Sequence, residues 1–184
     1  MKGKLCSTSL IHRPAGLKAK RLLLVGAGPR DRFGVTELRR IAATAGSHAV
    51  GKGVKSVAFA ALEGFEPGPA AQAIVEGVEI GSFEVGAYKT EGGEQSVIEE
   101  LYMALPDSAA AGIGRGMAVA RGQHTARALA NEPGNRLTPT VLAERAKELA
   151  ADVGLRSKSS TVRSSRSSAP ALCSASPKAA PSRR

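Results

Sequence analysis

Aromatic residues are scarce in this 184-residue chain, at 3% of the total, and tryptophan is absent. Binding through stacked rings or an aromatic-rich groove is therefore excluded as the main activity. Only two cysteines are present, Cys6 and Cys173, and they stand near opposite ends of the chain. This spacing forms neither a metal-binding motif nor a disulfide framework, and it suits a reducing compartment such as the cytoplasm.

Long apolar runs are also missing, because no stretch approaches the roughly 20 residues that a membrane helix needs. Lys2 and Lys4 are followed by the polar segment His-Arg-Pro at residues 12–14, which interrupts the apolar core of a signal peptide. Acids are absent before Asp31, as in a transit peptide, but the same stretch predicts two strands. We expect a cytoplasmic protein with no membrane partner.

Positive charge dominates the totals, with 26 Lys and Arg against 16 Asp and Glu and a formal net charge of +10. An excess of this size is typical of proteins that bind nucleic acid or anionic membranes. However, residues 156–184 alone hold seven basic residues and no acid, so residues 1–155 carry a net charge of only +3. The excess therefore indicates a basic tail on a nearly neutral body.

Hydrophobic patterning predicts strands that alternate with helices. Short apolar runs bounded by turn residues predict strands at residues 7–12, 21–26, 56–62 and 97–104. The second and third of these runs are continuous, as in strands buried on both faces. Apolar spacing of three and four predicts helices at residues 36–50 and 69–84, the latter weakened by Gly77 and Gly81. This order favours an α/β fold with a mostly parallel sheet flanked by helices.

Two further helices are predicted, at about residues 109–130 and 138–153. The second begins with Thr138 as its N-cap and Pro139 in its first turn, and Gly154 is placed to end it. Its apolar stripe consists of Leu142, Ala146, Leu149 and Val153.

The composition changes abruptly after residue 155. Residues 156–184 contain ten Ser, five Ala and three Pro, with two large aliphatic residues, which cannot bury enough apolar surface to offset chain entropy. We therefore predict a partial α/β domain at residues 1–108, connector helices at residues 109–155, and a disordered basic tail at residues 156–184.

Residue types that often occur in catalytic or cofactor sites are present, but their spacing in the sequence matches no known site. Residues 26–28 read G-A-G after a predicted strand, yet the third glycine of a dinucleotide motif would fall at Asp31, so we interpret them as a turn. Glu99 and Glu100 are neighbours, which places them on opposite faces of a strand rather than together as an acid–base pair. No second ligand stands at metal-binding spacing from any of the three histidines, His12, His48 and His124. We interpret the three histidines and the two glutamates as residues of a solvated surface. These patterns predict no catalytic, cofactor-binding or metal-binding residue.

The most specific pattern is at residues 126–139, which read ARALANEPGNRLTP and lead into the predicted helix TVLAERAKELAADVGL. Its N-E-P-G-N part is a rigid connector, because Pro133 fixes its own φ, biases Glu132 away from helix, and precedes Gly134, which allows a positive φ. With the following L-T-P, it closely resembles the joint between the N-terminal and catalytic domains in the leucyl aminopeptidase (cytosol aminopeptidase) family.

The resemblance also includes residues 11–26 and covers nearly all of residues 1–155. It implies the macro-like α/β N-terminal domain of these enzymes and the beginning of their catalytic domain. The resemblance implies a hexameric exopeptidase that releases N-terminal amino acids, preferentially Leu, from peptides. It also implies that two divalent metals, Zn or Mn, take part in this reaction. The family's metal ligands and catalytic residues lie beyond the matching part. The resemblance therefore implies no site residue in this chain, which we expect to be an inactive fragment that does not form the hexamer.

The alternative function is the binding of DNA or RNA. Basic disordered segments bind nucleic acid through phosphate contacts, and residues 157–168 have the composition of an Arg/Ser-rich RNA-binding segment. Some bacterial relatives in the resembled family also bind DNA, so either the tail or the N-terminal domain would carry this interaction. A third interpretation is a fragment that folds poorly because a missing first strand exposes a sheet edge.

The chain departs from the family pattern at both ends. The family's N-terminal domain has a further strand and helix before the part that matches residues 2–4, so we interpret Met1 as an internal or misassigned start. After residue 155 the family continues with V-E-V-L-D and then with G-A-L-x-G-V-A-x-G-S-x-x-P-P. The tail contains neither pattern.

We predict that a frameshift near Arg156 produced this tail. Codons compatible with residues 171–184, read from their third base, encode ALFGVAKGSAEPP, and residues 157–161 yield V-E-V-L-D in the same shifted frame. Sequencing the locus on both sides of the open frame is expected to show this shift. An intact frame with no shifted match downstream would refute it.

Overall fold

The computed structural model describes residues 3–60, 64–83, 96–158 and 176–177. The chain divides into two compact units, Met1–Ala130 and Asn131–Arg184. The first unit contains the α/β part and all but the last residue of the long helix α3 (Ala110–Asn131). The second unit contains helix α4 (Pro139–Asp152). Most of the predicted tail, residues 159–175 and 178–184, lies outside the described residues, so its predicted disorder stays a prediction.

The first two strands form an antiparallel hairpin. Strand β1 (Thr8–His12) pairs with β2 (Arg21–Val25), and the register runs from Thr8 opposite Val25 to His12 opposite Arg21. Both strands and the turn between them are thereby confirmed. The expectation that the second strand is buried on both faces is wrong, because Leu24 is 43% exposed. The hairpin lies at the surface of the unit, where only one face of a strand is covered.

Strands β3 (Ser56–Phe59) and β4 (Glu100–Met103) pair in parallel, which confirms an α/β fold with a short parallel sheet flanked by helices. Their exposure alternates along each strand, so the prediction of full burial for the third run is also wrong. The inner face packs against the helical core through Phe59, Leu101 and Met103. Residues 61 and 62 of the predicted strand lie outside the described residues.

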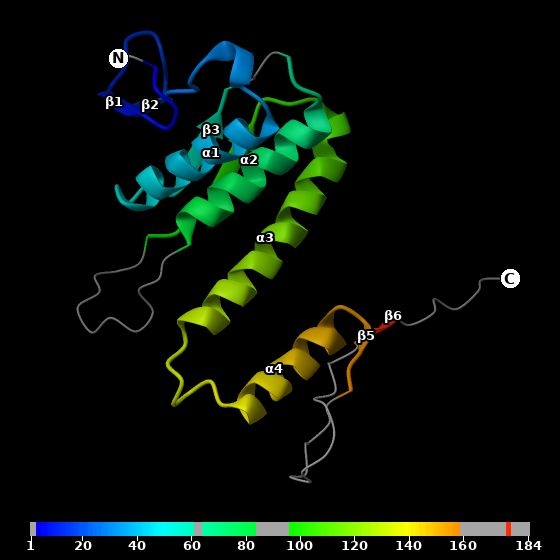
Figure 1. The fold of residues 1–184 in the computed structure, drawn as a ribbon. Helices are drawn as coiled ribbons and strands as arrows, with labels where there is room; N and C mark the ends of the chain where they lie inside the picture. Colours follow the sequence, from blue (N-terminus) through cyan, green and yellow to red (C-terminus); the bar gives the residue numbers. More distant parts are fainter. Residues whose placement is uncertain (1–2, 61–63, 84–95, 159–175, 178–184) are drawn as a thin grey trace, which may run out of the picture. The chain divides into compact units, whose positions relative to one another are not determined.

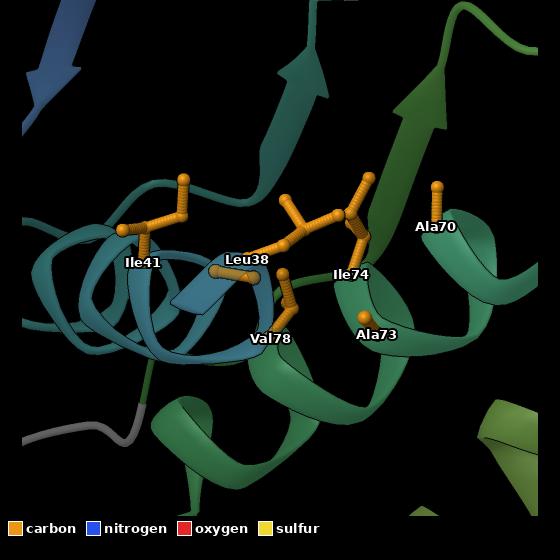
Figure 2. Close-up of a cluster of buried hydrophobic side chains, with 7 residues drawn as sticks. Leu38, Ile41, Ala70, Ala73, Ile74 and Val78 are labelled. Carbon is orange, nitrogen blue, oxygen red and sulfur yellow. The ribbon is translucent and has the colours of Figure 1, made fainter. Parts of the chain in front are cut away.

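Helices α1 (Val35–Val50) and α2 (Pro67–Ser82) build the core, close to the predicted ranges. The Glu37 carboxylate accepts a hydrogen bond of 3.1 Å from the Gly34 amide and caps α1, while Pro67 suits the first turn of α2. Figure 2 shows side chains of both helices gathered into one cluster. The cluster consists of Leu38, Ile41, Ala42, Ala70, Ala73, Ile74 and Val78.

Glycines allow α1 and α2 to pack at backbone contact. A Cβ atom on Gly46 would lie 2.7 Å from the Val78 carbonyl oxygen, and one on Gly77 would lie 2.6 Å from the Ala42 Cβ. At Gly81 the added carbon would overlap the Ala43 carbonyl group. Besides lowering the helix propensity of this segment, Gly77 and Gly81 therefore permit the close packing of the helix pair, which the sequence did not predict.

Helix α3, predicted at 109–130, packs on the other side of α2, so that α2 lies between α1 and α3 (Figure 1). Its contact face consists of small residues: Gly112 faces the Gly68 backbone, and a Cβ on Gly116 would lie 2.9 Å from the Val75 Cβ. Ala120, one turn further, is 2% exposed. The short 3₁₀ helices η1 (Arg30–Arg32) and η2 (Asp107–Ala109) precede α1 and α3. Within the described part of the chain, no helix is both long and apolar enough to cross a membrane.

In the second unit, α4 begins as predicted. The Thr138 hydroxyl accepts a hydrogen bond of 3.4 Å from the Val141 amide, and Gly154 adopts a φ of +71° two residues after the helix ends. The predicted apolar stripe is uncovered, since Leu142 and Leu149 are 44% and 46% exposed. Strand β5 (Leu155–Arg156) pairs antiparallel with β6 (Ser176–Pro177).

We predict that Gly81→Ala lowers the free energy of unfolding of the chain by about 1–3 kcal/mol, because the new methyl group overlaps the Ala43 carbonyl and forces the helices apart. Gly114→Ala is the matched control, since a Cβ on this α3 residue has no atom within 4 Å. It is expected to change stability by no more than about 1 kcal/mol, in the stabilising direction. Urea unfolding followed by circular dichroism measures both, and equal effects would contradict the close-packing explanation.

Candidate functional site

The described residues contain no group of three or more His, Cys, Asp or Glu side chains that could hold a metal ion. His12 is exposed at the end of β1, opposite Arg21. The positive charge of Arg21 disfavours the binding of a metal ion to His12. The prediction that no residue of this chain is a catalytic or metal-binding residue stays a prediction for the whole chain.

The G-A-G segment after β2 is a structural turn. The Gly26 amide donates to the Ser7 carbonyl at 2.7 Å, and the Gly28 amide donates to the Gly3 carbonyl at 3.0 Å. A Cβ on Gly26 would overlap the backbone carbonyl oxygen of Lys4, so the close approach of the preceding turn requires a glycine here. Because both amides are already bonded within the protein, they cannot cradle a phosphate group. This supports the turn interpretation over a dinucleotide site.

Glu99 and Glu100 do not form an acid–base pair. Glu99 binds the Lys55 ammonium at 2.7 Å, and their side chains are 58% and 68% exposed. The hydrogen bond and then the negative charge of Glu99 raise the pKa of Lys55 above its ordinary value. Glu100 is an exposed residue of β4. The solvated-surface interpretation of both glutamates is therefore confirmed.

A shallow pocket of about 640 Å³ lies between the start of the hairpin and the C-terminal end of α1. Its chemically functional residues include the free thiol of Cys6, the imidazole of His48 and the ammonium of Lys52. The His48 Nε2 atom is buried without a hydrogen-bond partner, which corrects the expectation of a solvated histidine. No carboxylate lines the pocket. A thiol and an imidazole without an acidic partner or a metal do not complete a hydrolytic site.

His124 is not isolated, although its neighbours in sequence suggested that it would be. Its Nε2 lies 2.9 Å from the Glu79 carbonyl oxygen and 3.7 Å from that residue's carboxylate. Since a carbonyl only accepts hydrogen bonds, this geometry assigns the proton to Nε2. Arg127, one turn later, donates to the Ile80 carbonyl at 2.9 Å and lies over the Phe83 ring. Two basic side chains of α3 thus cap the last carbonyls of α2.

The N-E-P-G-N connector is anchored to α4. Glu132, with a side chain that is only 9% exposed, forms an ion pair with Arg145 on α4. The Pro133 carbonyl accepts hydrogen bonds from the Arg136 and Leu137 amides at 2.8 and 3.0 Å, which closes the turn. The sequence predicts the rigid turn but not the ion pair, because the two partners stand on different elements and follow no periodic spacing.

Comparison with known proteins identifies the family of the chain. Residues 1–92 match the N-terminal domain of the cytosol aminopeptidase family. The chain belongs to the cytosol aminopeptidase family. This confirms the resemblance to that family inferred from the N-E-P-G-N connector.

The relatives are much longer than this chain. A probable cytosol aminopeptidase of Acidobacterium capsulatum is 40% identical over 156 residues, which cover 81% of this chain and 31% of the relative. The corresponding protein of Solibacter usitatus is 37% identical over 155 residues, which cover 83% and 32%. The chain thus spans about a third of the length of the curated relatives that it matches.

Solved structures agree with this assignment. A mutant of tomato leucine aminopeptidase is similar with a TM-score of 0.73 and 26% identity, over 85% of this chain and 32% of that protein. The bottromycin maturation enzyme BotP in complex with Mn is similar with a TM-score of 0.70, also at 26% identity, over 85% and 32%. The fold of the chain is therefore that of the corresponding third of these enzymes.

We predict that Glu132→Gln loosens the connector, because the substitution removes the charge that binds Arg145. The backbone amides of α4 are expected to exchange with solvent about fivefold faster, because one partly exposed charge-assisted hydrogen bond is lost. Hydrogen exchange of the full chain followed by mass spectrometry measures this. Glu144→Gln, at an exposed position of the same helix, is the control and should leave the rates unchanged. Equal rates in both variants would contradict an anchoring role for Glu132.

Proposed function

We propose that this chain is the N-terminal part of an aminopeptidase of the leucyl type, which releases N-terminal amino acids, preferentially Leu, from peptides in the cytoplasm. The observation that carries this proposal is the match to about a third of each relative, beginning with the family's N-terminal domain. The names of these relatives and the likeness to tomato leucine aminopeptidase support the substrate class.

The chemistry belongs to the part of the relatives that this chain does not match. The resemblance implies two divalent metals, Zn or Mn, and BotP is known in complex with Mn. The described residues do not fit such a centre, because they offer no cluster of three metal-binding side chains. We therefore assign no catalytic step to this chain and expect it to be inactive alone. We also expect no hexamer from it.

The architecture supports a role in positioning a following domain. The helix α3 is held along α2 by its small residues and by the His124 and Arg127 contacts, so its direction is fixed within the first unit. The connector that follows is closed by its own backbone hydrogen bonds and anchored to α4 by Glu132. Each unit thus provides a rigid element next to the joint.

The extent of the matches also supports the interpretation of the tail. Curated relatives cover between 80% and 85% of the chain, which is close to the share that residues 1–155 represent. This extent fits a family pattern that ends near residue 155 and a tail that does not share it.

We predict no release of nitroaniline from leucine p-nitroanilide by the purified chain, with or without added Mn²⁺ or Zn²⁺. The reason is that neither a metal-binding cluster nor another hydrolytic constellation is present among the described residues. The full-length relative from Solibacter usitatus, assayed in parallel, serves as the active control. Metal-dependent hydrolysis that co-purifies with this chain would contradict the assignment of the chemistry to the part of the relatives that this chain does not match.

A further inference from the structure

Exposed apolar side chains gather at the turn of the β1–β2 hairpin. Leu17, within the turn, is 54% exposed, and Ile11, in the next-to-last pair before the turn, is 40% exposed. Leu24 lies on the same face of the hairpin as Ile11, because Leu22, the partner of Ile11, stands two residues before it. Apolar groups that lie together at a surface indicate contact with another molecule or with a membrane.

Five basic side chains surround this turn. The Arg13 amide donates to the Lys20 carbonyl at 2.9 Å, next to the cross-strand pair of His12 and Arg21. The Arg21 guanidinium donates to the Lys52 carbonyl at 3.2 Å, which places the residues after α1 beside the turn. All five basic residues are exposed. We call this group the basic hairpin end; it consists of Arg13, Lys18, Lys20, Arg21 and Lys52.

The basic hairpin end forms no ion pair within the described part of the chain. None of the four ion pairs found there involves its five side chains. The first acid of the sequence, Asp31, follows the opposite end of β2, because this strand runs from Arg21 beside the turn to Val25. The positive charge around the turn is therefore available to an anionic partner.

The backbone of the turn has a defined shape. Arg13 adopts a left-handed φ of +49°, which is unfavourable for a residue other than glycine or asparagine, and Gly16 turns the chain with a φ of +79°. The Leu17 amide then donates to the Pro14 carbonyl at 3.4 Å. Apolar and basic side chains are thus displayed together on a structured turn, so a partner that binds them does not have to order the backbone.

We propose that the basic hairpin end, together with Leu17 and Ile11, binds the surface of a membrane that contains anionic phospholipids. Lys and Arg side chains are attracted to the negatively charged headgroups. Apolar side chains gain free energy when they enter the boundary between the headgroups and the acyl chains. An anionic lipid surface therefore satisfies both kinds of side chain at the turn.

A nucleic acid is a poorer partner for this surface. Its phosphate groups would attract the cations, but Leu17 and Ile11 would stay in water. The sequence-based expectation of no membrane partner follows from the absence of a spanning segment. Binding at the membrane surface does not require such a segment.

Two variants with equal reductions in charge test the electrostatic attraction in the full chain. The hairpin variant combines Arg13→Asn, which tolerates the positive φ, with Lys18→Gln, Lys20→Gln and Lys52→Gln. The tail variant removes four positive charges by Arg163→Gln, Arg166→Gln, Arg183→Gln and Arg184→Gln. Arg21 is left unchanged, because its guanidinium donates to the Lys52 carbonyl. Co-sedimentation is measured with vesicles of phosphatidylcholine alone and with vesicles of phosphatidylcholine and phosphatidylglycerol in equal amounts.

We expect the parent chain to bind the anionic vesicles at low salt, to bind them less as the salt concentration rises, and not to bind phosphatidylcholine alone. The partition coefficient of the hairpin variant should fall at least about tenfold, because each Lys or Arg near an anionic surface strengthens binding by about fivefold. The partition coefficient of the tail variant should fall less than about threefold. The melting temperatures of both variants should stay near that of the parent chain.

The absence of tryptophan from the chain allows a direct test of the apolar contact. Leu17→Trp places a single tryptophan in the turn, and Leu142→Trp places one on the exposed apolar stripe of α4 as the matched control. An indole ring that moves from water to the headgroup region emits at shorter wavelength. We expect anionic vesicles to cause this shift in Leu17→Trp and to leave the emission of Leu142→Trp unchanged.

Several results would overturn the proposal. One is the absence of binding to anionic vesicles at low salt, and another is an equal decrease in both charge variants, which would indicate net charge alone. An emission shift confined to Leu142→Trp would assign membrane binding to α4. Release of the parent chain from anionic vesicles by an equal concentration of DNA phosphate would identify nucleic acid as the preferred partner. Because membrane binding does not depend on peptidase chemistry, the assay with leucine p-nitroanilide tests the proposed function separately.

Discussion

The contact between the backbones of α1 and α2 is the constraint on which the first unit depends. Gly46 on α1 and Gly77 and Gly81 on α2 leave no room for a side chain at the crossing. The two helices then present Leu38 and Ile74 as one apolar surface, and the inner face of β3–β4 lies on that surface. Because α2 also receives α3 on its other side, a shift at this crossing would displace every element of the unit (Figure 1).

Most elements could be predicted from the sequence, because apolar periodicity and capping residues act locally. Both helices of the core and the Thr138 cap of α4 lie within a few residues of their predicted positions. Burial was harder to predict. A continuous apolar run such as that at 21–25 resembles a fully buried strand, but whether a second layer covers it depends on distant parts of the chain.

At the candidate site, too, features set by neighbouring residues could be predicted from the sequence, and contacts between distant residues could not. The turn at residues 26–28 and the separation of Glu99 from Glu100 follow from spacing alone. The contact of His124 with Glu79 does not, because 45 residues separate the partners and no repeat relates them. The family is recognisable from a short connector motif because its proline and glycine have specific backbone requirements.

In the described part of the chain, the parallel pair β3–β4 has a covered inner face and an exposed outer face. Tyr102, on the outer face of β4, is 57% exposed, although parallel strands in soluble domains are usually covered on both faces. An uncovered face and a strand edge with free backbone groups attract identical surfaces on other molecules. The consequence is practical. We therefore expect the chain to aggregate at high protein concentration, and we expect a charged side chain in place of Tyr102 to improve its solubility.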